Sequence, residues 1–190
     1  RLLHNGHPFF HLRNEPGMAE RTITLLGPSK TESLSGYRLG VVVAPEVIVR
    51  RMENMLSITS LRAPAYAQNL LVHWLRDDKE WLAARIPEFT ALGTLTQTKF
   101  AQLPWLRQSA GAGTAYSWPD VSALGMPADE VAAMFLTRAG VLVSPGYQFG
   151  EGCDGFFRVC YARDEATWSD ALDRMVDLLD EQATQRGLGR

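Results

Sequence analysis

Two short apolar runs mark the first part of the chain and predict strands. Residues 22–26 and 39–44 are rich in aliphatic and β-branched side chains, and three consecutive valines occupy positions 41–43. A continuous apolar run of this length, bounded by turn residues, is typical of a strand that is buried on both faces. We therefore predict two strands of a large sheet, the second of them buried, joined by the turn-rich segment 27–40.

Helical spacing follows these strands. Pro45 suits the first turn of a helix that we expect to run to about Leu56, and Pro64 opens a second helix. The second helix carries apolar residues at helical spacing, namely Leu70, Leu71, Trp74 and Leu75. A further helical stretch runs from residue 79 toward residue 103, in spite of an internal proline. We expect the second helix to link two domains.

The pattern changes after about residue 103, where short strands alternate with helices. The predicted strands cover residues 106–109, 114–118, 141–144 and 156–161, and the predicted helices cover residues 128–138 and 164–181. Strands mixed with covering helices are typical of an α+β domain. We assign residues 65–190 to this domain.

Composition and charge exclude several classes of function. The chain has 190 residues, of which 46% are apolar and 21% charged, and 19 basic residues face 21 acidic ones. Without a basic cluster, the electrostatic footprint of a nucleic-acid-binding protein is missing. No apolar run approaches the roughly 18 residues of a membrane span, and the first residues lack the apolar core of a signal peptide. We expect no nucleic-acid or membrane partner and a cytoplasmic location.

The segment between the two predicted strands holds the most informative chemistry. Lys30 and Arg38 stand eight residues apart in a turn built from small residues. A lysine amine can form a Schiff base with a carbonyl, and the planar guanidinium of an arginine can hold phosphate oxygens with two parallel hydrogen bonds. This spacing suits a cofactor that carries both an aldehyde and a phosphate, although a lysine in such a loop could also be merely solvated.

The same segment reads GPSKTESLSGYRLG and resembles the lysine signature of class I and II aminotransferases, which are fold-type I pyridoxal phosphate enzymes. In that signature a small-x-small-Lys stretch precedes Gly-x-Arg-x-Gly. The resemblance implies that Lys30 is the catalytic Schiff-base lysine, and that Arg38 and Ser29 bind pyridoxal 5'-phosphate. Pro28 departs from the family pattern, and Gly27 stands where many relatives carry a phosphate-binding serine. These departures imply a weaker or differently completed phosphate site.

A second motif lies near the C-terminus, where SPGYQFGEG occupies residues 144–152 and leads into the predicted strand 156–161. It resembles the family's Pro-Gly-x-x-Phe-Gly loop, which precedes a strand whose arginine binds the α-carboxylate of the substrate. The resemblance implies this role for Arg158. Strand alternation places Phe157 on one face and Arg158 on the other. Taken alone, an arginine in an apolar strand could instead extend to solvent or form a salt bridge.

The resemblance also extends to the loop that precedes Pro64. Relatives carry there a loop that reaches the cofactor of the neighbouring subunit, and Arg62 occupies the place of a polar amide. Arg62 could bind a second carboxylate on an acidic substrate, or it could be a surface residue at a helix start. Because the family forms dimers with shared active sites, the resemblance implies a homodimer.

A metal site is not predicted. His4, His7 and His11 are closely spaced, but Pro8 interrupts any helical register and no cysteine or carboxylate set completes a ligand group.

The resemblance implies an α/β fold class, as the C-terminal part of a fold-type I pyridoxal phosphate-dependent transferase. Residues 1–64 would be a remnant of the large cofactor-binding domain, and residues 65–190 the small α+β domain. The implied function is that of an aminotransferase in amino acid metabolism or biosynthesis, with an amino acid and a 2-oxo acid as substrates. A lyase or cyclase of the same fold, or a non-catalytic sensor domain of a transcription regulator, remains an alternative.

We expect the chain to be the C-terminal half of a longer protein, because its start is a turn-rich loop without an opening element. In the resembled family, further cofactor-binding residues would lie upstream of Arg1. The isolated chain is therefore expected to be inactive, and the sequence does not identify the amino donor.

Overall fold

The computed structural model describes residues 2–109 and 111–188, and these fall into two units. Unit 1 comprises His7–Arg85, and unit 2 comprises Leu2–Gly6 together with the described residues from Ile86 onward. The predicted domains, 1–64 and 65–190, do not coincide with these units. The predicted division concerns a longer protein and stays a prediction.

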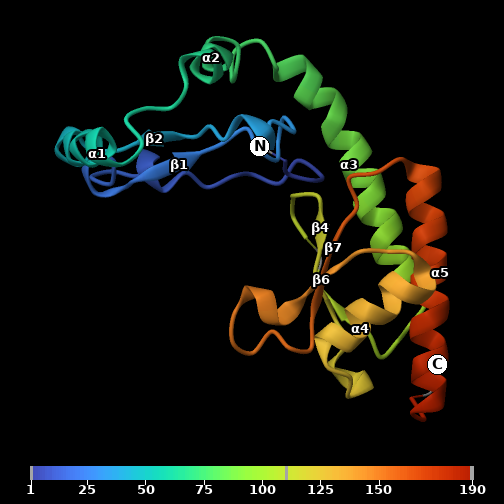
Figure 1. Cartoon of the computed structure of the whole chain (residues 1–190). Helices are drawn as coiled ribbons and strands as arrows, with labels where there is room; N and C mark the ends of the chain where they lie inside the picture. The colour runs from blue at the N-terminus through green and yellow to red at the C-terminus, as the bar shows by residue number, and fades with distance from the viewer. Residues whose placement is uncertain (1, 110, 189–190) are drawn as a thin grey trace. The chain divides into compact units, whose positions relative to one another are not determined.

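Unit 1 is built around a hairpin and one long helix (Figure 1). Strands β1 (Thr24–Leu26) and β2 (Val41–Val43) are antiparallel, and Leu25 pairs with Val42. The helices of the unit are α1 (Glu46–Thr59), α2 (Ala65–Gln68) and the 3₁₀ turns η1 (Leu12–Asn14), η2 (Ala19–Arg21), η3 (Ser35–Tyr37) and η4 (Asn69–Val72). Both predicted strands and the helix after Pro45 are thus confirmed.

The prediction that strand 39–44 is buried is wrong. Leu39 is buried, but Val41 and Val42 are only half-buried and Val43 is exposed. Three β-branched residues in a row indicate burial on both faces only when layers cover both faces of the sheet, and here β2 belongs to a sheet of two strands.

The two predicted helices of unit 1 differ from the structure at their ends. Helix α1 continues to Thr59, and in its last turn the Ser57 and Thr59 hydroxyls donate to the carbonyls of Asn54, at 2.6 Å, and Met55, at 2.9 Å. The second predicted helix breaks up into α2 and η4, and Leu75 adopts a left-handed backbone with φ of 70°. Its apolar spacing therefore does not correspond to one continuous helix.

Helix α3 (Lys79–Phe100) begins in unit 1 and continues into unit 2. It confirms the helical stretch predicted beyond residue 79, and Pro87 lies within it. Because the units divide between Arg85 and Ile86, α3 connects them. The predicted linking helix after Pro64 concerns the predicted domains, and its role stays a prediction.

Two small antiparallel sheets form the strands of unit 2. The larger has the order β4 (Tyr116–Ser117), β7 (Phe157–Cys160), β6 (Ser144–Pro145), and the smaller pairs β3 (Arg107–Gln108) with β5 (Pro119–Asp120). Three of the four predicted strands contain one of these elements, and the fourth, 141–144, shares only Ser144 with β6. The sequence missed β5, because a proline lacks the backbone N–H of a ladder and lowers a strand prediction.

Helices cover this sheet and complete the core of unit 2. They are α4 (Ala128–Met134), α5 (Glu165–Gln185), the π-helical turn η6 (Phe135–Ala139) and the 3₁₀ turns η5 (Ser122–Leu124) and η7 (Gly146–Phe149). Helix α5 lies beside the C-terminal half of α3 (Figure 1), and its Trp168 Nε1 donates to Thr96 Oγ1 at 2.9 Å. Phe157 of β7 is fully buried between Phe100 and Phe135, with ring centroids 6.1 and 5.1 Å away.

The segment Leu2–Gly6 joins unit 2 although it precedes unit 1 in the sequence. The Thr114 amide donates to the Leu2 carbonyl, and the His4 amide donates to the Ala112 carbonyl, both at 2.9 Å. A side chain at Gly113 would place its Cβ 2.2 Å from the Leu2 carbonyl oxygen, so only glycine permits this approach. The sequence predicted none of this pairing.

Candidate functional site

The candidate cofactor-binding turn, residues 27–40, closes the hairpin between β1 and β2. Pro28 is buried in it, and its carbonyl accepts hydrogen bonds from the amides of Glu32 and Leu34, both at 3.2 Å. At the far end, a Cβ at Gly40 would lie 3.3 Å from the Leu26 carbonyl oxygen. The proline that departs from the resembled signature therefore serves as the buried anchor of this turn.

Lys30 follows Pro28 by two residues and has an exposed side chain, and Ser29 between them is half-buried. Across residues 2–109 and 111–188, no hydrogen bond or ion pair engages the Lys30 ammonium. The neighbouring carboxylate of Glu32 accepts instead from the Thr31 hydroxyl. The lysine amine is thus presented by a defined backbone turn and is not held by an acidic neighbour.

Arg38 lies at the other end of the turn and has a left-handed backbone, with φ of 51°. Its Nη1 donates to the Ser35 carbonyl at 2.9 Å, and the side chain is otherwise exposed. A guanidinium has five N–H donors, so this one bond leaves donors for a ligand. An amine, a guanidinium and a hydroxyl within one turn are the donor set that an aldehyde and a phosphate require, and the residues present fit pyridoxal phosphate.

Arg62 is exposed in the tight turn that follows α1. Its amide donates to the Ser60 carbonyl at 2.9 Å, and Leu61 before it has φ of 62°. In the part of the chain that the structure describes, the Arg62 side chain makes no hydrogen bond or ion pair. Its proposed substrate role stays a prediction.

Arg158 belongs to unit 2, in the middle of β7. Phe157 and Val159 on either side of it are 0% and 2% exposed, whereas Arg158 is half-buried on the other face. The predicted alternation is therefore confirmed. The Arg158 Cζ lies 4.6 Å from the ring centroid of Tyr116 and 4.8 Å from that of Phe149.

The polar contacts of Arg158 leave most of its donors available. Nη2 lies 3.3 Å from Ser144 Oγ, which belongs to the paired residue on β6. Over the two described ranges, no carboxylate forms an ion pair with this guanidinium. Of the interpretations open from the sequence, a salt bridge within the described ranges is thus not what the structure shows. Carboxylate binding by Arg158 stays a prediction.

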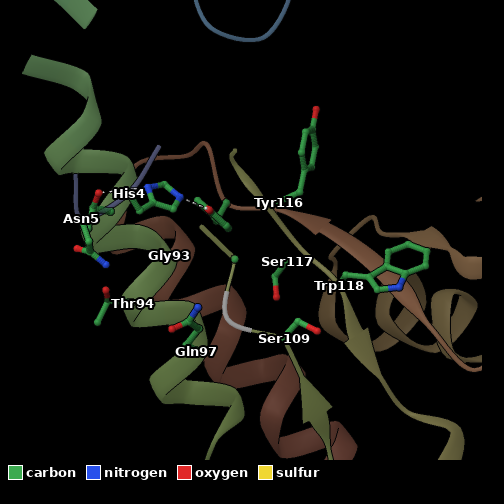
Figure 2. Close-up of a pocket in the computed structure, with 12 residues that line it drawn as sticks. His4, Asn5, Gly93, Thr94, Gln97, Ser109, Tyr116, Ser117 and Trp118 are labelled. Atoms are coloured by element: carbon green, nitrogen blue, oxygen red, sulfur yellow. Dashed lines mark hydrogen bonds between the residues drawn. The ribbon is translucent and has the colours of Figure 1, made fainter. Parts of the chain in front are cut away.

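A polar pocket of about 140 Å³ lies between α3 and β4 (Figure 2). Ser117 points into it toward Gln97 and Ser109, whereas the Tyr116 ring points away, as strand alternation requires. The pocket therefore lies on the opposite face of β4 from the Tyr116 ring that contacts Arg158.

His4 closes one side of this pocket and is only 5% exposed. Its Nδ1 lies 3.1 Å from Thr90 Oγ1, and its Nε2 lies 2.9 Å from Tyr161 Oη, which in turn donates to the Thr114 carbonyl at 2.9 Å. Burial raises the pKa of Tyr161 to about 12. In the sequence, His4 stands out only as a possible metal ligand, and no local pattern signals a contact across 157 residues.

The predicted site residues thus fall into two groups. Lys30, Ser29 and Arg38 share one turn of unit 1, Arg62 lies elsewhere in that unit, and Arg158 lies in unit 2. Among the described residues, no three His, Cys, Asp or Glu side chains gather as metal ligands would. Likewise, no described helix combines the length and apolarity that crossing a bilayer requires.

Comparison with known proteins gives a consistent result. The family model described as aminotransferase class I and II matches residues 7–175. Aromatic-amino-acid aminotransferase 2 of Thermococcus litoralis is 29% identical over 95% of this chain and 47% of its own length. The aspartate aminotransferase of Pyrococcus abyssi is 31% identical over 87% of this chain and 43% of its own length.

A solved structure shows the same architecture. An aspartate aminotransferase from Rhodobacter sphaeroides 2.4.1 superposes with a TM-score of 0.89 at 32% identity, covering 94% of this chain and 46% of that protein. The chain therefore spans about half the length of the curated relatives it matches.

Proposed function

The chain belongs to the class I and II aminotransferase family, and on this premise we propose that it supplies the lysine and the carboxylate-binding arginine of an aminotransferase. Its fold is that of the C-terminal part of a fold-type I pyridoxal phosphate-dependent transferase, as the sequence predicted. The observation that carries the proposal is the pair of available cations, Lys30 on the turn of residues 27–40 and Arg158 on β7.

Pyridoxal phosphate is the cofactor of this family, and the donors of the turn suit it. When bound, it supplies an electron sink that stabilises negative charge at the substrate Cα. Lys30 would hold it through Nζ, while Arg38 and Ser29 would bind its phosphate. With its amine free, Lys30 Nζ would accept the proton from the substrate Cα and would later give it up again, so that Lys30 would act as both base and acid.

Arg158 would bind the α-carboxylate of the amino acid and of the 2-oxo acid. A planar guanidinium binds a carboxylate with two parallel hydrogen bonds and so fixes the orientation of the Cα–H bond. Arg62 would bind a second carboxylate if the substrate is acidic. The amino donor is not identified by these residues.

The remaining parts of the proposal concern a longer protein. Because the chain spans about half the length of its curated relatives, we expect the other residues of the active site to come from outside it. Within that protein we propose a homodimer with shared sites, acting in amino acid metabolism. A cytoplasmic location stays a prediction.

Lysine labelling tests the cofactor site directly. The chain has three lysines, Lys30, Lys79 and Lys99, and Lys99 pairs with Asp173. The protein is incubated with pyridoxal phosphate and reduced with borohydride, and the modified peptide is mapped by mass spectrometry. We expect stoichiometric label on Lys30 that disappears in Lys30→Ala and persists in the matched control Lys79→Ala. Label on Lys79 or Lys99 in place of Lys30, in the chain and in the longer protein, contradicts the proposal.

Transamination is then separated from the alternatives by a half-reaction. In a separate, unreduced sample loaded with the amine form of the cofactor, a 2-oxo acid should convert that form to the aldehyde form, which restores the aldehyde absorbance. A lyase or cyclase, or a sensor domain without turnover, would bind the cofactor at Lys30 without this conversion.

A further inference from the structure

The guanidinium of Arg158 rests on two aromatic rings that come from different segments of the chain. Tyr116 belongs to β4 and Phe149 to the end of η7, and both ring centroids lie within 5 Å of the Arg158 Cζ, at 4.6 and 4.8 Å. Distances below about 6 Å are those of cation–π attraction. The arginine is thus fixed along its length by the strand and at its tip by the two rings.

Both rings are themselves held in place. Tyr116 pairs across the sheet with Cys160, two residues beyond Arg158 on the same face of β7. Phe149 packs edge-to-face on Trp118, with centroids 4.9 Å apart, and Trp118 stacks on Phe156 at 5.5 Å. A row of rings therefore supports the surface on which the guanidinium lies.

The turn that carries Phe149 has little freedom to move. The Gly146 amide donates to the Phe156 carbonyl at 2.8 Å, and a Cβ at Gly146 would lie 1.8 Å from the Cys153 carbonyl oxygen. Turn η7 is therefore pressed against the backbone of residues 153–156, and only glycine fits at its start.

Burial of the rings does not explain this arrangement. Phe149 is 43% exposed and Tyr116 is only half-buried, so neither ring belongs to the core of unit 2. The rings do cover a cation that has no ion pair within the described ranges. They leave its N–H donors, apart from the Nη2 contact at 3.3 Å with Ser144, for a ligand.

We infer that Tyr116 and Phe149 are positioning residues for carboxylate binding, an inference that rests on the proposed role of Arg158. A long arginine side chain loses rotamer freedom when it binds, and this loss weakens binding. The two rings restrict the guanidinium before the ligand binds. The loss of rotamer freedom therefore occurs during folding and does not weaken ligand binding. The ligand group is a carboxylate that meets the guanidinium edge, with the rings beside it.

The test measures carboxylate binding to the 190-residue chain, with acetate as the probe. The Nε–Hε resonance of Arg158 is followed by NMR in the unaltered chain and in Tyr116→Leu, Phe149→Leu and Tyr116→Phe. Tyr147→Leu is the matched control, because Tyr147 is 53% exposed on the same turn. Arg158→Lys removes the resonance and assigns it.

We expect the dissociation constant of acetate to rise about fivefold in Tyr116→Leu and in Phe149→Leu, since one such contact is worth about 1 kcal/mol. In both leucine variants the Nε–Hε bond of Arg158 should also become more mobile on the picosecond-to-nanosecond timescale, which lowers its NMR order parameter. Tyr116→Phe keeps a ring and should change binding less than about twofold, as should Tyr147→Leu. If Tyr116 had only a structural role, the mobility of Arg158 would be the same in Tyr116→Phe and Tyr116→Leu.

Two results would overturn the inference. One is unchanged acetate affinity and unchanged Arg158 order in both leucine variants, and the other is no acetate binding at Arg158 in the unaltered chain. Lysine labelling reports on the proposed function independently. If Lys30 is labelled but the leucine variants bind acetate normally, only the positioning role is rejected. If acetate binding follows the expected pattern but Lys30 is not labelled, only the proposed function is rejected.

Discussion

The two units carry the two halves of the candidate chemistry, but they differ in how they are stabilised. Unit 2 has a continuous core in which residues of β7, α3 and α5 pack together, and Phe157, Leu172 and Met175 are fully buried. In unit 1, helix α1 buries none of its residues. Apolar side chains on it are open to solvent, among them Val47 at 67%, Met55 at 64% and Ile58 at 84% exposure.

This difference follows from the number of layers in each unit. A two-stranded hairpin and one helix cannot cover each other on all apolar faces, whereas a three-stranded sheet with helices against it can. Arg158, the proposed carboxylate-binding residue, thus lies in a unit that has its own packed core. The lysine lies on a turn whose local geometry is held by backbone hydrogen bonds more than by a core.

The largest effect should come from removing a ring in the core of unit 2. Phe157→Ala empties the space between Phe100 and Phe135 and should lower the free energy of unfolding by about 3–5 kcal/mol. Ile58→Ala on α1 is the matched control and should stay within about 0.5 kcal/mol. Urea unfolding, monitored by hydrogen exchange, measures the free energy of unfolding of both variants. Equal losses in the two variants would mean that unit 1 shares the core of unit 2.

The next effect concerns pH and Tyr161. The pKa of Tyr161 is raised from 10.0 to about 12, chiefly because burial disfavours the phenolate. Between these pH values the unfolded chain has lost the phenol proton while the folded chain keeps it, so raising the pH favours unfolding. This contribution is fully present below pH 10 and lost as the pH rises to about 12, which corresponds to roughly 2–3 kcal/mol.

The measurement is the pH dependence of the unfolding free energy in the unaltered chain and in Tyr161→Phe. The variant lacks the titrating group, so its stability curve above pH 10 should be flatter. Parallel curves for the two proteins would count against a raised pKa at this site.

A smaller effect is expected from the segment that crosses from the start of the chain into unit 2. His4→Ala removes the imidazole contacts with Thr90 and Tyr161 and should cost about 1–3 kcal/mol. His7→Ala is the matched control, because His7 is exposed, and should change stability by less than about 0.5 kcal/mol. Thermal unfolding compares them. If both variants behave alike, the Leu2–Gly6 segment does not stabilise unit 2.

The smallest effect sharpens the contrast between site and scaffold. Lys30→Ala should abolish cofactor labelling while changing the free energy of unfolding by less than about 0.5 kcal/mol, since the side chain is exposed. Urea unfolding without cofactor measures this. A loss above 1 kcal/mol would indicate that Lys30 has a structural role in the turn.

Much of the local structure was predictable because it follows from short-range patterns. The two strands beside the lysine turn, the helices beginning after Pro45 and Asp164, and the position of Arg158 on the face opposite Phe157 all correspond to spacing along the chain. The burial of residues 41–43 was mispredicted because it depends on what covers the sheet. The missed strand β5 depends on a partner, β3, that lies elsewhere in the sequence.

By itself, the sequence determined the family and the cofactor class and proposed the residues of the site, because a lysine turn and an arginine strand are local motifs whose spacing can be read directly. Only the tertiary structure decided which rings hold Arg158 and that His4 reaches Tyr161. Such contacts join residues far apart in the chain. They form only when strands and helices pack around a common core. The periodicity of the sequence indicates which face of an element is apolar, but not which element that face will contact.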